Sequence, residues 1–168
     1  MSWLRSKKFI YFVFCCSNVL LNIDQGVLPA ATNEMMIDLD LTEIEFGCLG
    51  SLMYIGLIAG STIAGYIYQH FSCKRVVIFN LFCTGVCLSF FTYTNNIYFL
   101  GFSRISTGFF QVFLVIFFPV WVDIFGGKSK TLWLTVLQIG VPLGTFLGYA
   151  LTVMSLTLLN VREISLFF

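Results

Sequence analysis

Residues 97–122 read IYFLGFSRISTGFFQVFLVIFFPVWV, and Arg104 is the only charged side chain among them. A helix rises 1.5 Å per residue, so about 20 apolar residues cross the hydrocarbon core of a bilayer. The run is long and continuous, without the alternating pattern of about ten residues that a membrane β-barrel requires. It therefore predicts a membrane-spanning helix.

Similar apolar runs recur along the chain between short polar connections. We expect five spans, at residues 9–30, 46–70, 76–93, 97–122 and 131–156. The composition agrees, because 58% of the residues are hydrophobic and only 10% are charged, against about 25% charged in soluble domains. Residues 165–168 turn apolar again, which predicts the start of a sixth helix. The predicted fold is all-α, a polytopic transmembrane helix bundle that occupies residues 1–168.

The charged residues are sorted between the two sides of this predicted bundle. The connection from Glu34 to Glu45 is acidic and holds no Lys or Arg, whereas most basic residues fall on the opposite side. These basic residues are Arg5, Lys7, Lys8, Lys74, Arg75, Lys128 and Lys130. By the positive-inside rule, the amino terminus of this integral, multi-pass protein is predicted to be cytoplasmic. The sequence does not indicate which membrane holds it.

Several other classes of function find no support in the sequence. The net charge is only +1 and the basic clusters are short, so we expect no nucleic-acid partner. The six cysteines form no CxxC pair, and we interpret them as small apolar residues rather than as a metal or redox site. No Ser-His-Asp set, HExxH motif or phosphate-binding loop is present. We therefore expect neither an enzyme nor a cofactor.

Arg104 is the sharpest candidate for function, because a charge inside the membrane requires a counter-charge or a wet cavity. Asp24 lies six residues before the outer end of the first span, and Arg104 seven after that of the fourth. At 1.5 Å per residue both lie about 10 Å deep, so they could pair. One interpretation is a substrate or proton-coupling site near the outer gate. The other is a structural ion pair or a snorkelling arginine.

Polar side chains form stripes at helical spacing on two of the predicted spans. Gln111 falls on the same face as Arg104, and Asn22 and Gln25 share a face of the first span. These stripes suggest a shared cavity, and hydrogen bonds between helices are the alternative interpretation. The candidate substrate or proton-coupling residues are Arg104, Asp24, Asn22, Gln25, Gln111 and Gln138.

Glycines repeat every four residues on two spans. Gly140, Gly144 and Gly148 form a smooth face on the fifth span, and Gly56 and Gly60 form a comparable face on the second. Small residues allow helix backbones to approach closely in a membrane. We therefore favour helix packing over direct contact with a solute at all five positions.

Three motifs resemble those of the major facilitator superfamily. The segment from Gly65 to Arg75, between the second and third spans, is similar to the family's loop signature, with Gly65, Lys74 and Arg75 matching and Gln69 replacing its acidic residue. The fourth span carries Arg104 where the family has an intramembrane arginine. Residues 140–148 resemble the glycine and proline pattern of the family's fifth helix, and residues 22–26 resemble a sequence of spinster-like members.

The resemblance implies the amino-terminal half of a twelve-helix transporter, in which two six-helix halves enclose a midplane site. It implies secondary active transport of a small or amphiphilic solute by alternating access, with proton or ion coupling. The expected partners are membrane lipid, the solute, and a second half or a second copy of the chain. The alternatives are a non-transporting membrane subunit that docks through its glycine-rich helix faces in a larger complex, or a truncated gene product.

Overall fold

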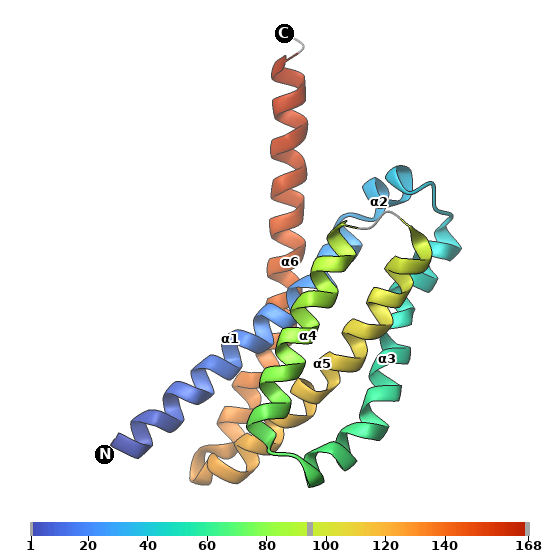
Figure 1. The fold of residues 1–168 in the computed structure, drawn as a ribbon. Coiled ribbons are helices and arrows are strands. Elements are labelled where there is room, and N and C mark those ends of the chain that lie inside the picture. The colour runs from blue at the N-terminus through green and yellow to red at the C-terminus, as the bar shows by residue number, and fades with distance from the viewer. Residues whose placement is uncertain (1, 94–95, 167–168) are drawn as a thin grey trace. The chain divides into compact units, whose positions relative to one another are not determined.

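The computed structural model describes residues 2–93 and 96–166, and within these residues it contains helices and no strand. The elements are α1 (Ser2–Ala30), α2 (Thr32–Asp38), α3 (Glu43–His70), α4 (Cys73–Tyr93), α5 (Ile97–Phe125), a 3₁₀ turn η1 (Gly127–Ser129) and α6 (Lys130–Leu166) (Figure 1). Five described helices, namely α1, α3, α4, α5 and α6, are long and apolar enough to cross a membrane. The predicted all-α bundle with five spans is confirmed.

Local polar interactions set the ends of α2 and α3. The amide of Glu45 donates to Thr42 Oγ1 at 3.3 Å, and the amide of Thr42 donates to Glu45 Oε2 at 2.9 Å, so α3 begins with a capping box. It starts at Glu43, three residues before the predicted Phe46. At the end of α2, Asp40 has a φ of 50° and the amide of Leu41 donates to Met36 O at 3.0 Å.

Helix α6 differs from the expected fifth span at its carboxyl end. We expected this span to end near residue 156 and a sixth helix to start at residue 165, but α6 runs without a break through Arg162 and Glu163 to Leu166. Residues 157–166 contain neither Gly nor Pro, so nothing in the backbone interrupts the helical hydrogen bonds. The last two residues of the expected sixth helix, 167–168, lie outside the described residues.

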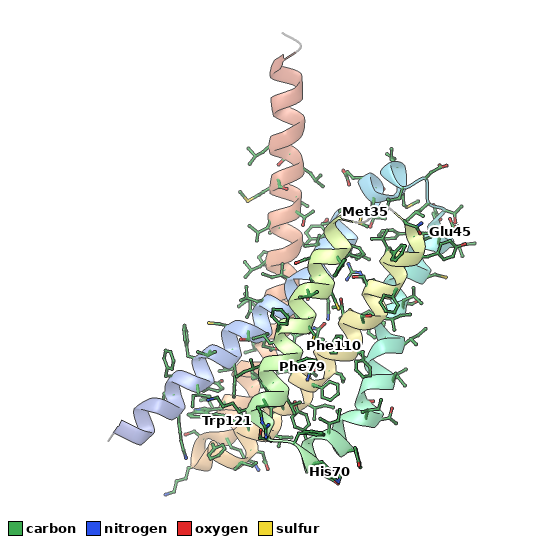
Figure 2. All side chains as sticks on the ribbon, in the orientation of Figure 1. Met35, Glu45, His70, Phe79, Phe110 and Trp121 are labelled. Carbon is green, nitrogen blue, oxygen red and sulfur yellow. The ribbon has the colours of Figure 1, made fainter. Side chains whose placement is uncertain are left out.

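The chain divides into two compact units. One, which we name the terminal unit, comprises Met1–Glu34 and Val122–Phe168, and the other, the central unit, comprises Met35–Trp121. Figure 2 labels Met35 and Trp121, the first and last residues of the central unit.

The terminal unit is built on α1 packed along α6 in a parallel direction. Near the start of both helices, the Tyr11 hydroxyl donates to Trp133 O at 2.9 Å and the two rings stack with centroids 4.5 Å apart. Further along both helices, a Cβ added at Gly26 would lie 2.7 Å from the Tyr149 amide nitrogen. The amino-terminal ends of α1 and α6 therefore lie at the same end of this pair. This is required of the first and fifth spans of a chain that crosses a membrane back and forth.

Glycines allow this close approach. A Cβ added at Gly140 would lie 3.0 Å from Asn18 Nδ2, and one added at Gly144 would lie 2.9 Å from Asn22 Cβ. Gly148 meets the α1 backbone in the same way. Because side-chain atoms are absent at these positions, the two helices come close enough for the side-chain amide of Asn18 in α1 to reach the Leu137 carbonyl of α6.

The central unit contains a second parallel pair, α3 and α5, with α4 antiparallel to both. A Cβ added at Gly60 of α3 would lie 2.6 Å from Val112 Cγ1, and one at Gly108 of α5 would lie 3.0 Å from the Met53 carbonyl carbon. Toward the end of both helices, the Tyr68 hydroxyl donates to Phe113 O at 2.7 Å. The core beside this contact contains Ala64, Val76, Val112 and Phe113.

Candidate functional site

Four buried polar residues lie along α5 in the central unit. Ser103, Arg104, Thr107 and Gln111 expose 6%, 5%, 1% and 2% of their surfaces, and we name them the α5 polar face. The Ser103 hydroxyl donates to the Cys87 carbonyl of α4 at 2.6 Å, and Thr107 Oγ1 donates to Ser103 O at 2.8 Å. Ser103 therefore ties α5 to α4 and sets the rotation of this face.

Arg104 is held against an aromatic ring of α4. Its guanidinium carbon lies 4.0 Å from the centroid of the Phe91 ring, which is a cation–π contact. Such a contact contributes about 2 kcal/mol when it is desolvated, whereas a charge at the centre of a membrane helix costs about 2.5–3.5 kcal/mol on insertion scales. The ring thus offsets much of that cost and orients the charge.

Helix α4 adds two buried polar residues that the sequence reasoning missed. Asn80 and Thr84 are buried, and both donate back to their own helix, Asn80 to Val76 O and Thr84 to Asn80 O, each at 2.8 Å. The available signal was their four-residue spacing inside an otherwise apolar run, which places them on one helix face. These bonds lower the cost of burying polar groups in a membrane helix.

In the terminal unit, the polar stripe of α1 is used in helix packing. Asn18 Nδ2 donates to Leu137 O of α6 at 2.8 Å, and Asn22 Nδ2 donates to Asn18 O at 2.7 Å. Pro142 lies inside α6 and removes one hydrogen bond of the helix, because it has no N–H to donate to Gln138 O. The side-chain amide of Asn18 donates to Leu137 O, the carbonyl next to that of Gln138. This bond to α1 therefore lies beside the place where α6 lacks one of its own.

The remaining predicted residues are placed differently. Asp24 and Gln25 are half-buried on α1, and Gln138 is exposed on α6. Arg104 and Gln111 lie together on the α5 polar face. Asp24 belongs to the terminal unit and Arg104 to the central unit, so their pairing stays a prediction.

The five glycines singled out in the sequence all contact another helix of their own unit. Gly56 and Gly60 meet α5, and Gly140, Gly144 and Gly148 meet α1. These faces are therefore already covered within the chain. The alternative of a subunit that docks through its glycine faces loses the surface on which it depended.

The loop motif between α3 and α4 is exposed. A Cβ added at Gly65 would meet no atom within 4 Å, and Lys74 and Arg75 are exposed in the first turn of α4. Arg75 Nε donates to Ser72 Oγ at 2.7 Å. This bond turns the guanidinium toward the connection between the two helices.

Charged residues gather where α1 and α6 begin in the terminal unit. Lys7 Nζ lies 4.9 Å from the centroid of the Phe125 ring, and Lys130 forms an exposed ion pair with Asp123. The basic ends of α1 and α6 are thus at the same end of this parallel pair. This arrangement fits the predicted sorting of basic residues, although the orientation in a membrane stays a prediction.

Comparison with known proteins yields one family. The family model described as Major Facilitator Superfamily matches residues 10–168, a range that includes the α5 polar face and every glycine of the two packing faces. None of the curated proteins compared with the chain matches it. The spinster-like subfamily suggested by residues 22–26 is not supported by this match and stays a hypothesis.

Proposed function

This chain belongs to the Major Facilitator Superfamily, and we propose that it takes part in secondary active transport of a small or amphiphilic solute by alternating access. The family consists of transporters rather than enzymes, and five apolar helices make the chain an integral, multi-pass membrane protein. The proposal concerns the mechanism and the kind of solute.

The observation that carries the proposal is the buried cation Arg104 beside hydrogen-bonding groups on the same helix face. Thr107 and Gln111 follow at one and two helical turns, and both are almost fully buried. A charge at depth that is kept oriented by a ring is expensive in a membrane helix and usually marks a substrate or ion pathway. We infer that Arg104 binds an anionic group of the solute, with Gln111 as a hydrogen-bonding partner.

Asp24 is the proposed residue for proton coupling. It is the one carboxylate well inside a described candidate span, since Glu43, Glu45 and Asp123 lie at helix ends. A carboxylate inside the membrane can gain and lose a proton as its surroundings change from wet to dry. Asn22, Gln25 and Gln138 remain weaker candidates, because Asn22 is engaged in the α1 stripe and Gln138 is exposed.

We further propose that transport requires more helices than the five candidate spans described here. The fold of the family encloses its midplane site between two helix bundles. A second copy of the chain or a separately made second half would complete that site. Cross-linking and mass measurement of the purified protein in detergent would show whether it forms a defined dimer.

The test is solute uptake by vesicles that contain the protein together with the helices that complete it. Vesicles are incubated with a mixture of sugars, organic anions and amphiphiles, and their contents are identified by mass spectrometry. We expect Arg104→Ala to reduce uptake to background and Arg104→Lys to retain part of it, because the charge is needed. Lys128→Ala, an exposed cation in the η1 turn, is the control and should transport normally. Undiminished uptake by Arg104→Ala would refute the role of this residue.

A further inference from the structure

The central unit has an apolar groove formed by the end of α3, the first half of α4 and the middle of α5. Its volume is about 420 Å³, within the range of about 300–1,000 Å³ that is usual for ligand sites. The floor is formed by Val76, Asn80 and Phe113, which expose 7%, 4% and 1% of their surfaces. Phe79 of α4 and Phe110 of α5, labelled in Figure 2, form one wall of the groove and contact each other edge to face, with ring centroids 6.4 Å apart.

One end of the groove is positively charged. Arg75 lines it, and the bond from its Nε to Ser72 Oγ fixes the side chain there. Lys74 is exposed at the same helix connection. The sequence from Phe46 to Val122 contains no Asp or Glu, so this segment supplies no acidic counter-charge for its cations. The groove thus combines a long apolar surface with a cation at its mouth.

We propose that this groove binds an anionic glycerophospholipid, with one acyl chain along the Phe79 and Phe110 rings and the phosphate on Arg75. A guanidinium presents parallel N–H donors that match phosphate oxygens, which suits Arg better than a point charge. Basic pockets between membrane helices bind anionic head groups for this reason. Lys74 adds a second cation next to Arg75 in the sequence.

The head group, rather than the acyl chain, decides which lipid is held. Lipid tails are as apolar as the groove, so filling it with one tail rather than another has little hydrophobic driving force. The selectivity therefore has to come from the charge at Arg75. Arg104 does not line this groove, so the lipid site is separate from the α5 polar face on which the proposed transport function rests.

The experiment uses the full chain in detergent, mixed with phosphatidylglycerol or phosphatidylcholine and examined by native mass spectrometry. We expect retained phosphatidylglycerol and little phosphatidylcholine. Arg75→Gln should lower phosphatidylglycerol retention about fivefold, the factor expected for one basic charge near an anionic surface. Arg75→Lys should restore part of it, and Phe79→Ala should weaken it by opening one wall. Lys128→Gln removes an exposed cation that does not line the groove and should retain the lipid like the unaltered chain.

Four results would overturn the proposal. Equal retention of the two lipids would mean apolar adhesion, and equal losses in Arg75→Gln and Lys128→Gln would mean diffuse attraction. Unchanged retention in Phe79→Ala would show that the groove holds no acyl chain. Displacement of the lipid by inorganic phosphate alone would indicate a site for a free anion. Circular dichroism of each variant verifies folding, and Arg75→Lys provides the comparison if Arg75→Gln unfolds.

Discussion

The α1–α6 pair and the α3–α5 pair are both parallel and glycine-lined, yet they place their polar side chains differently. In α1–α6 the amide of Asn18 lies in the contact itself and donates to Leu137 O. The α3–α5 contact is mainly apolar and aromatic, with the Tyr68 hydroxyl bonded to Phe113 O at one end. On α5, Ser103 and Arg104 instead contact α4, where Ser103 bonds to Cys87 O and Arg104 lies over the Phe91 ring.

This difference separates two uses of a polar side chain in lipid. An amide that donates to the backbone of the partner helix holds a pair together, because in lipid the amide N–H has no water to donate to. An arginine over a ring is a charge held in a fixed direction, and a charge at depth often marks a pathway for a solute or an ion. The stripe of α1 is accordingly the structural one, and the α5 polar face is the stronger candidate for function.

The glycine contacts provide the largest expected effect on stability. Gly56→Ala and Gly148→Ala should each lower the free energy of unfolding by about 1–3 kcal/mol, because the new Cβ meets backbone that cannot move aside. Gly65→Ala is the matched control, since its Cβ would meet no atom within 4 Å and a helical Gly→Ala change should stabilise by about 0.5–1 kcal/mol. Titration of the protein with SDS, followed by circular dichroism, measures these changes. Equal free energies of unfolding for all three variants would refute the close contacts.

Replacement by Leu should affect stability at Asn18 and the response to solute at Gln111. Asn18→Leu removes the bond to Leu137 O and should destabilise the protein by up to about 1.7 kcal/mol, the upper range for interhelical hydrogen bonds. It should leave intact the rise in melting temperature that a transported solute causes. Gln111→Leu should abolish that rise. If Asn18→Leu also removes the response to solute, the assignment of the α1 stripe to helix packing is wrong.

Tyr68→Phe should cause a smaller loss of stability. The variant removes only the hydroxyl that bonds to Phe113 O, so a cost of about 0.6 kcal/mol is expected, the average for such bonds in a membrane protein. Tyr54→Phe, on the exposed surface of the same helix, is the control and should cost nothing measurable. A loss of several kcal/mol in Tyr68→Phe would show that this bond, rather than the glycine contact, holds α3 to α5.

Asp123→Asn should have the smallest effect. Its ion pair with Lys130 is exposed, and such pairs contribute about 0.2–1 kcal/mol at low salt. The difference from the unaltered chain should disappear at high salt, because ions screen exposed charges. An undiminished difference at high salt would indicate that the carboxylate has a role other than this pair.

The sequence predicts the spans well, because lipid requires long apolar runs and short polar connections separate them. The fourth span was predicted at 97–122 and observed at 97–125. The errors have local causes, since the capping box at Thr42 adds polar residues to the start of α3. Helix α6 continues past residue 156 because hydropathy marks where the membrane ends and not where helical hydrogen bonding ends.

The candidate site was predictable only in part. Seven-residue spacing, two helical turns, placed Gln111 on the face of Arg104, and both are buried on α5. The ring of Phe91 could not be foreseen, because its contact depends on how α4 is rotated against α5. The same holds for the glycines, since spacing predicts a close approach without naming the partner helix. Asn80 and Thr84 were missed because two small polar residues hardly alter the hydropathy of α4.

The parallel pairing of α1 with α6 also affects the order of assembly during synthesis. Asn18 bonds to a residue 119 positions later, whereas the Tyr68–Phe113 bond spans 45 positions. At about 5–20 residues per second, α1 waits roughly 6–24 s for its partner and α3 roughly 2–9 s for α5. During that time the side-chain amide of Asn18 lacks its acceptor on α6. Retention of α1 by the insertion machinery until α6 emerges would avoid the cost of exposing this amide to lipid.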